Sequence, residues 1–173
     1  MTGRLFAALY PSAAAVTDLE LVTAALPSLK RPAPSHQWHV TIAFVGVAGD
    51  PAPVRAALAE AGGRTLRLRV AGGGAFGRPG RDSVLWAGLE GDLAGLHALG
   101  DDVRAALDRH GVAYDERPLR PHLTLGRDDR DLGPDLALLD AYRGPWWETT
   151  ELLLVESSGG EYRVLDRYPS RSS

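Results

Sequence analysis

His39-Val40-Thr41-Ile42 and His122-Leu123-Thr124-Leu125 are the two stretches of this sequence that decide the fold. Each has the form His-x-Thr-x, with an apolar residue at both x positions. Successive side chains of a strand point to opposite faces, so the histidine and the threonine of each motif share one face and the apolar residues share the other. If two halves of the chain pack with pseudo-symmetry, both His-Thr pairs face one cleft.

This constellation suits displacement at phosphorus. An in-line reaction needs a base on the attacking oxygen and an acid on the leaving oxygen, and two imidazoles with ordinary pKa values of about 6.5 can divide these roles near neutral pH. Threonine hydroxyls can donate to the non-bridging phosphate oxygens. The arrangement requires no metal ion and no cofactor. One copy of the motif is a weak signal, since any strand can hold it by chance, and two copies on predicted strands are a much stronger one. The alternative is a pair of ordinary strands with partly exposed histidines.

The composition is that of a folded protein without cysteine chemistry. The 173 residues are 45% hydrophobic and 24% charged, and there is no cysteine, which excludes disulfides, thiolate zinc sites and cysteine nucleophiles. A protein that coats nucleic acids nonspecifically would normally be basic, whereas this chain has a net charge of −3. Any binding site for a polyanion must therefore be local. No apolar run approaches the length of a membrane span and no signal peptide is evident, so we expect a cytoplasmic protein that does not bind membranes.

Hydrophobic periodicity predicts strands and helices that alternate twice, which suggests two similar halves. We expect strands at residues 4–10, 38–45, 65–70, 84–89, 121–126, 147–156 and 162–168. We expect helices at residues 13–29, 52–61, 92–110 and 134–142. Residues 71–82 are rich in glycine and predict a loop. The repetition suggests a single bilobal domain over residues 1–173, with approximate halves 1–90 and 91–173.

The sequence resembles the two-histidine (2H) phosphoesterase superfamily, and within it the bacterial and archaeal RNA 2′,3′-cyclic phosphodiesterases, also described as 2′-5′ RNA ligases. The resemblance covers nearly the whole chain. It rests on the two motifs and on the segments 4–8, 44–46, 84–88, 120–127 and 156–162. It implies a bilobal α+β fold of two pseudo-symmetric halves, with antiparallel sheets around a central cleft.

The resemblance also implies the roles of individual residues. His39 would be the general acid that protonates the leaving O3′, and His122 the general base that activates water; the symmetry of the motifs alone leaves this assignment open. Thr41 and Thr124 would bind the phosphate. Arg127 corresponds to an arginine that stacks on the nucleobase.

Phe6 and Arg120 are further candidates for contact with the substrate. Family members often carry an aromatic pair near the first strand, one ring of which stacks opposite the arginine of the second motif. Here Phe6 is followed by Ala7, so the second ring is absent.

Other residues with side chains typical of functional sites are interpreted as structural. His36 and His39 form His-x-x-His without a nearby carboxylate or thiolate cluster, so His36 is interpreted as a loop histidine rather than a metal ligand. Arg78 and Arg81 belong to the predicted flexible loop, with RNA contact beyond the scissile phosphate as the alternative. The Trp146-Trp147 pair is expected to pack the last sheet rather than to form a stacking platform.

The function that these observations favour is hydrolysis of 2′,3′-cyclic phosphate ends of RNA or nucleotides to 2′-phosphomonoesters, with reversible 2′-5′ ligation as a further capacity that the resemblance implies. The partner would be the RNA or nucleotide itself, with no obligate protein partner. Two alternatives remain open: the same site acting on 2′-5′ oligonucleotides or ADP-ribose cyclic phosphate, and an RNA-end-binding module without catalysis.

Overall fold

Nine strands and four α-helices make up the described part of the chain in the computed structural model, which covers residues 3–78 and 81–170. The strands are β1 (Arg4–Leu9), β2 (Arg31–Pro32), β3 (Val40–Val47), β4 (Leu66–Arg78), β5 (Arg81–Gly91), β6 (Leu123–Asp128), β7 (Trp147–Thr149), β8 (Glu151–Ser158) and β9 (Glu161–Pro169). The helices are α1 (Ala13–Ala24), α2 (Ala52–Ala61), α3 (Leu93–Arg109) and α4 (Gly133–Asp140), with a 3₁₀ turn η1 at Ser35–Gln37.

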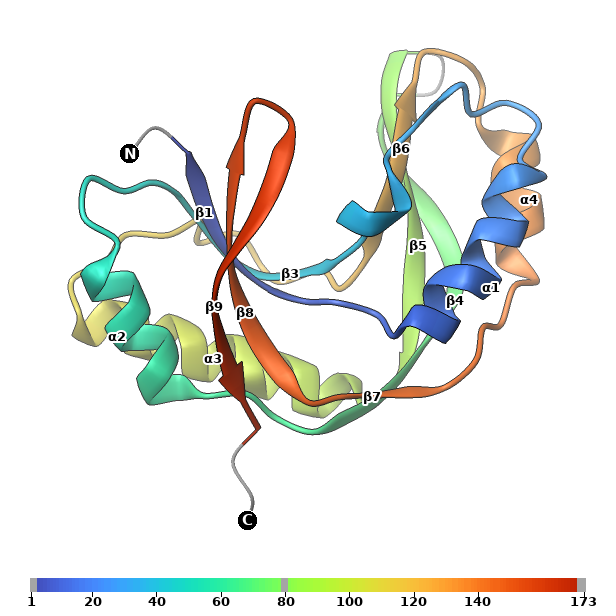
Figure 1. The fold of residues 1–173 in the computed structure, drawn as a ribbon. Helices are drawn as coiled ribbons and strands as arrows, with labels where there is room; N and C mark the ends of the chain where they lie inside the picture. Colours follow the sequence, from blue (N-terminus) through green and yellow to red (C-terminus); the bar gives the residue numbers. More distant parts are fainter. Residues whose placement is uncertain (1–2, 79–80, 171–173) are drawn as a thin grey trace.

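The strands form one sheet in the order β7-β4-β5-β6-β3-β1-β8-β9, and β2 adds to β6. The named strand pairs are antiparallel. β3 and β6 are joined through one residue pair, Val40 with Leu123. On either side of this junction the sheet divides into two lobes, one built on β1, β3, β8 and β9 and the other on β4, β5 and β6 (Figure 1). The predicted α+β, bilobal antiparallel fold is therefore confirmed.

The chain passes repeatedly between the two lobes. Each lobe takes strands from both sides of residue 90, because β1 and β3 pair within the lobe that contains β8, whereas β4 and β5 pair with β6 and β7. The helices α2 and α3 pack together beneath the first lobe, and α1 and α4 lie along the outer side of the second (Figure 1). Among the described residues, no helix is long and apolar enough to span a membrane.

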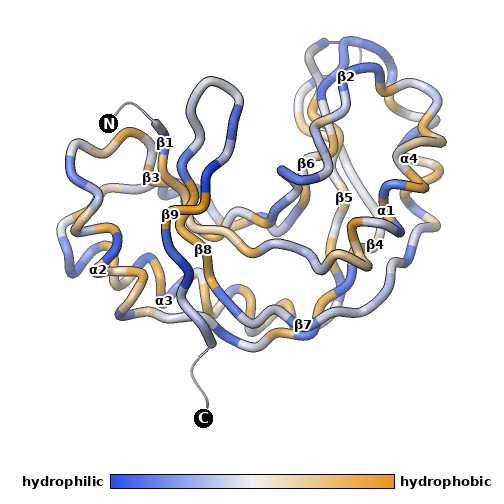
Figure 2. The backbone as a smooth tube through the Cα atoms, viewed as in Figure 1, coloured by the Kyte–Doolittle hydropathy of each residue, from blue (hydrophilic) through white to orange (hydrophobic). Residues whose placement is uncertain are grey.

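A single large hydrophobic core runs under both lobes. The core contains alternate residues of each central strand, among them Val40, Ile42, Leu123 and Leu125, which are 0–1% exposed. Their side chains point into the core, away from the opposite face of the sheet. A second, small cluster of Phe6, Ala8, Leu153 and Val155 lies on that opposite face of β1 and β8. Figure 2 shows hydrophobic stretches of backbone in both lobes.

Three sequence expectations are corrected. Residues 71–78 continue strand β4 instead of forming a loop, because β5 supplies hydrogen-bonding partners to the glycine-rich segment; residues 79–80 lie outside the described part. The strand expected at 147–156 is two strands that serve different lobes, β7 beside β4 and β8 beside β1. The helix expected at 13–29 ends at Ala24, where the N–H of Ala25 bonds to the carbonyls of Val22 and Thr23.

Two carboxylates anchor the segment that leads into β2. Asp135, which is 0% exposed, accepts hydrogen bonds from the backbone N–H groups of Ser28 and Leu29, both at 2.9 Å. Asp128, 5% exposed, accepts from Lys30 N at 2.7 Å. These bonds replace strand or helix partners for three consecutive amides, and they hold the chain against β6.

We expect Asp135→Ala to destabilise the protein by about 2–4 kcal/mol, because two backbone N–H groups would lose their acceptors at a buried position. Urea unfolding measures this cost. The matched control is Asp131→Ala, which removes an exposed carboxylate that caps Gly133 N at 2.9 Å and should cost about 1 kcal/mol or less. Equal losses in the two variants would contradict the anchoring role of Asp135.

Candidate active site

The two motifs lie side by side at the junction of the lobes. Val40 pairs with Leu123, and both side chains point into the core. Continuing this antiparallel register by one residue in each direction sets Thr124 beside His39 and Thr41 beside His122. All four polar residues are half-buried on the face opposite the core, and the two imidazoles are close enough for the charge of His122 to act on His39.

Backbone contacts define the tautomer of His39. Its Nδ1 lies 2.7 Å from the carbonyl oxygen of Gln37, which can only accept, so Nδ1 carries the hydrogen. Its Nε2 lies 3.0 Å from Oγ1 of Thr41. The nitrogen that can exchange a proton with a ligand is therefore Nε2, on the side of the motif threonine.

Aromatic rings surround His39 and affect its charge. The Phe6 ring stacks on the imidazole with centroids 4.8 Å apart, and Tyr162 and Tyr10 lie at 5.5 Å and 6.2 Å. Burial lowers the pKa of His39 below its ordinary value, and the charge of His122 adds to this, while the Gln37 carbonyl opposes it. His39 of the free protein is therefore biased toward its neutral form.

His122 is oriented by a backbone carbonyl in the same way as His39. Its Nδ1 donates to the carbonyl of Arg120, two residues earlier, which again leaves Nε2 for proton transfer. Phe76 and Trp86 pack against the imidazole with centroids at 5.1 Å and 5.9 Å. The Arg120 guanidinium lies 5.9 Å from the Phe76 ring centre, so this exposed arginine stands next to the second histidine.

A bulge in β6 brings Arg127 to the face of Thr124. Thr124 pairs with Trp86 and Arg127 pairs with Val84, with a register shift between the pairs. Trp86 and Val84 are two residues apart and share a face of β5. Thr124 and Arg127 therefore share a face although they are three residues apart, and Arg127 is exposed there.

The first motif has the same bulge, and it reveals a residue that sequence reasoning missed. Thr41 pairs with Ala8 and Phe44 pairs with Phe6, again with a register shift between them. Phe44 is consequently on the face of Thr41, where it is 38% exposed. It occupies in the first lobe the position that Arg127 occupies in the second. Phe6, in contrast, is only 4% exposed and packs on His39, so its ring offers little surface for a base.

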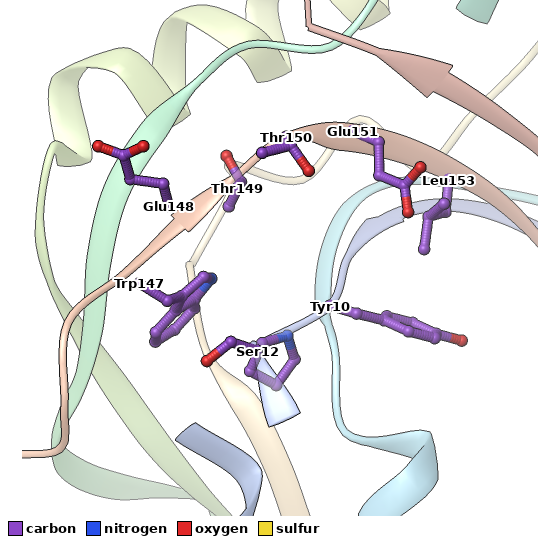
Figure 3. A pocket seen from close by; sticks show the side chains of 9 residues that line it. Tyr10, Ser12, Trp147, Glu148, Thr149, Thr150, Glu151 and Leu153 are labelled. Carbon is purple, nitrogen blue, oxygen red and sulfur yellow. The ribbon is translucent and has the colours of Figure 1, made fainter. Parts of the chain in front are cut away.

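Two cavities of the protein are lined by residues near the first motif but by none of the motif residues themselves. One of about 280 Å³ lies between Tyr10 and the segment around Trp147, and Figure 3 shows Tyr10 and Trp147 at its opposite sides. It is lined by Glu148 and Glu151 and by no basic side chain, which disfavours a phosphate. The geometry of the motifs is therefore the better guide to the site.

The other sequence candidates lie apart from this geometry. His36 is exposed on the 3₁₀ turn, and within residues 3–78 and 81–170 no three His, Asp or Glu side chains come together as a metal site. Arg78 and Arg81 pair with each other in the β4–β5 hairpin. Trp147 is buried as expected, whereas Trp146 is 40% exposed beneath the guanidinium groups of Arg67 and Arg69.

A family model described as the 2′-5′ RNA ligase superfamily matches residues 8–161. The chain belongs to this superfamily. RNA 2′,3′-cyclic phosphodiesterase of Aeropyrum pernix is 33% identical over 92 residues, 52% of each chain, and that of Escherichia coli K12 is 33% identical over 106 residues, 59% of this chain and 57% of the relative. The aligned regions thus span about half the length of these superfamily members. Escherichia coli LigT complexed with 3′-AMP has the same fold, with a TM-score of 0.76 and 26% identity over 98% of this chain and 99% of LigT.

We expect Tyr162→Ala to raise the pKa of His39 toward about 6.5, because removing the ring hydrates the imidazole and favours its charged form. NMR titration of the His39 ring measures the shift. Tyr114→Ala, which removes a ring of the same size that packs against Arg104 of α3, is the control and should leave His39 unchanged. An unaltered titration in Tyr162→Ala would show that the aromatic cluster does not set the charge of His39.

Proposed function

We propose that this protein hydrolyses 2′,3′-cyclic phosphate ends of RNA or nucleotides to 2′-phosphomonoesters. The observation that carries the proposal is the junction of the two His-x-Thr-x strands, which sets two histidines and two threonines on one face. The names of the superfamily members that it resembles support the choice of substrate. A cytoplasmic location and the capacity for 2′-5′ ligation are parts of the same proposal.

In the proposed reaction, Nε2 of His122 takes a proton from water and the water oxygen bonds to phosphorus. The P–O3′ bond breaks, and Nε2 of His39 gives its proton to O3′, which leaves a 3′-hydroxyl and a 2′-phosphate. The hydroxyls of Thr41 and Thr124 donate to the non-bridging oxygens and hold the phosphate between the imidazoles.

The lowered pKa of His39 places a condition on its role as an acid. In the free protein burial favours neutral imidazole, which cannot donate from Nε2. A bound cyclic phosphate carries a negative charge next to the ring, and this charge favours the imidazolium. Substrate binding and protonation of His39 are therefore coupled, and Thr41 must turn its hydroxyl from Nε2 toward the phosphate.

His39→Ala and His122→Ala should each lower kcat/KM on the order of 10²-fold or more, because each removes one proton-transfer group. The assay follows a 2′,3′-cyclic-phosphate-terminated RNA with EDTA-treated protein, and NMR distinguishes a 2′-phosphate from a 3′-phosphate. His97→Ala, an exposed histidine on α3, is the control. Full activity in both single variants would exclude the mechanism; RNA-end binding without turnover in the wild type would favour the binding module.

The pH profile assigns the two roles when it is combined with Tyr162→Ala. Because this variant raises the pKa of His39, the limb of the kcat/KM profile that moves to higher pH belongs to His39. We expect the alkaline limb to move, since an acid must be protonated. A shift of the acidic limb instead would make His39 the base and reverse the roles of the two histidines.

We further propose that Phe44 and Arg127 hold the terminal nucleobase from opposite lobes. They occupy equivalent positions after the two bulges, both are exposed, and an aromatic ring and a guanidinium are both good partners for a base. Phe44 thus supplies the ring that is absent at Ala7.

Phe44→Ala should lower kcat/KM for 2′,3′-cyclic AMP about tenfold or more, mainly through KM, since stacking on one ring contributes about 1–3 kcal/mol. Val47→Ala removes another exposed apolar side chain of β3 and is the matched control. Identical kinetics in Phe44→Ala and wild type would remove Phe44 from the base site.

A further inference from the structure

Arg31 lies directly opposite Arg127 at the outer end of the second lobe. β2 pairs with β6 so that Arg31 faces Arg127 and Pro32 faces Gly126. Cross-strand neighbours point to the same face of a sheet, so Arg31 shares the face of Arg127 and Thr124. Figure 2 shows β2 at the end of this lobe, where the backbone is coloured hydrophilic.

Thr124, Arg127 and Arg31 lie in a row that leads away from the candidate phosphate site. Thr124 and Arg127 pair with Trp86 and Val84, which are two residues apart on β5, so the two side chains are separated by about 7 Å along the sheet. Arg31 lies one strand further out, about 5 Å from Arg127 between Cα atoms. A nucleotide chain that ends at Thr124 and places its terminal base at Arg127 would bring its preceding phosphate toward Arg31.

Two guanidinium groups lie opposite each other in this region, beside the carboxylate of Asp129. Like charges directly opposite each other in a sheet repel, and a bound anion reduces that repulsion. Arg31 has an ion pair with Asp129 at 3.6 Å, with the two side chains 59% and 72% exposed. Such a long, exposed pair contributes little to stability, so it can yield to a phosphate, which arginine binds with two parallel hydrogen bonds.

The backbone on either side of Arg31 is held by hydrogen bonds to β6. Lys30 N bonds to Asp128 and Ala33 N bonds to the carbonyl of Leu125, both at 2.7 Å. Gly126 lets β2 approach closely, because a Cβ there would lie 2.5 Å from the Arg31 carbonyl oxygen. A binding group on a backbone that is already ordered loses less entropy when it binds.

We propose that Arg31 binds the phosphate on the 5′ side of the terminal nucleotide, so that the substrate is an RNA chain rather than a cyclic mononucleotide. This inference rests on the proposed function, since it takes the scissile phosphate to lie at the two motifs. It goes further in naming a residue that distinguishes RNA ends from free nucleotides.

The test compares three substrates: 2′,3′-cyclic AMP, the dinucleotide ApA with a 2′,3′-cyclic end, and the same dinucleotide with an uncharged methylphosphonate linkage. We expect the wild type to prefer the charged dinucleotide on the order of tenfold in kcat/KM. In Arg31→Gln this preference should fall to that seen with the uncharged linkage, while hydrolysis of 2′,3′-cyclic AMP stays unchanged. Arg31→Lys should retain part of the preference.

Arg64→Gln is the matched control, because Arg64 is also exposed and also pairs with one aspartate, Asp102, at 2.8 Å. The salt dependence of kcat/KM for the charged dinucleotide should weaken in Arg31→Gln by about 0.7 in the logarithmic slope, the value for one phosphate contact on a single strand. Equal activity of Arg31→Gln and wild type on all three substrates, or an equal loss on all three, would overturn the inference. Absence of turnover of every cyclic substrate by the wild type would instead overturn the proposed function.

Discussion

The pairing of Val40 with Leu123 is the contact on which the rest of the structure depends. It joins the two lobes of the sheet, and both side chains are fully buried. Because strand residues alternate between faces, this burial forces His39, Thr41, His122 and Thr124 onto the other face. A slip of one residue would bury four polar groups and expose the apolar ones, so the hydrophobic core enforces the register that assembles the site.

The two bulges are the part of the site that strand periodicity could not predict. Period-two alternation relates His39 to Thr41 and His122 to Thr124, and it places the residue three positions after each threonine on the core face. Bulges reverse that expectation in both motifs. Period-two alternation would place Phe44 on the core face, and Arg127 is identified from the sequence only through resemblance to a family.

Elements with a strong local period were predictable, and those that depend on distant partners were not. The helix predicted at 52–61 has the observed bounds, because the glycines that stop it, Gly62 and Gly63, are a local signal. The glycine-rich end of β4 is a strand because β5 is beside it. Likewise, the chain passes from one lobe to the other at Thr150, between β7 and β8. An apolar run in the sequence does not reveal this change of partner strand.

The two lobes share the same bulged strand backbone but carry different side chains. This difference makes the candidate site asymmetric. His39 is enclosed by three rings and its pKa is lowered, whereas arginines gather on the side of His122: Arg120 beside Phe76, and Arg127 with Arg31 along β6. These three guanidinium groups lie on the side of His122, where the carboxylate of Asp129 also lies. Under the proposed function, an RNA chain would extend over the second lobe, while the first lobe would contribute a desolvated imidazole and an exposed ring. The similar backbones of the two lobes would position the reacting phosphate, and their different side chains would determine the direction in which the attached chain extends.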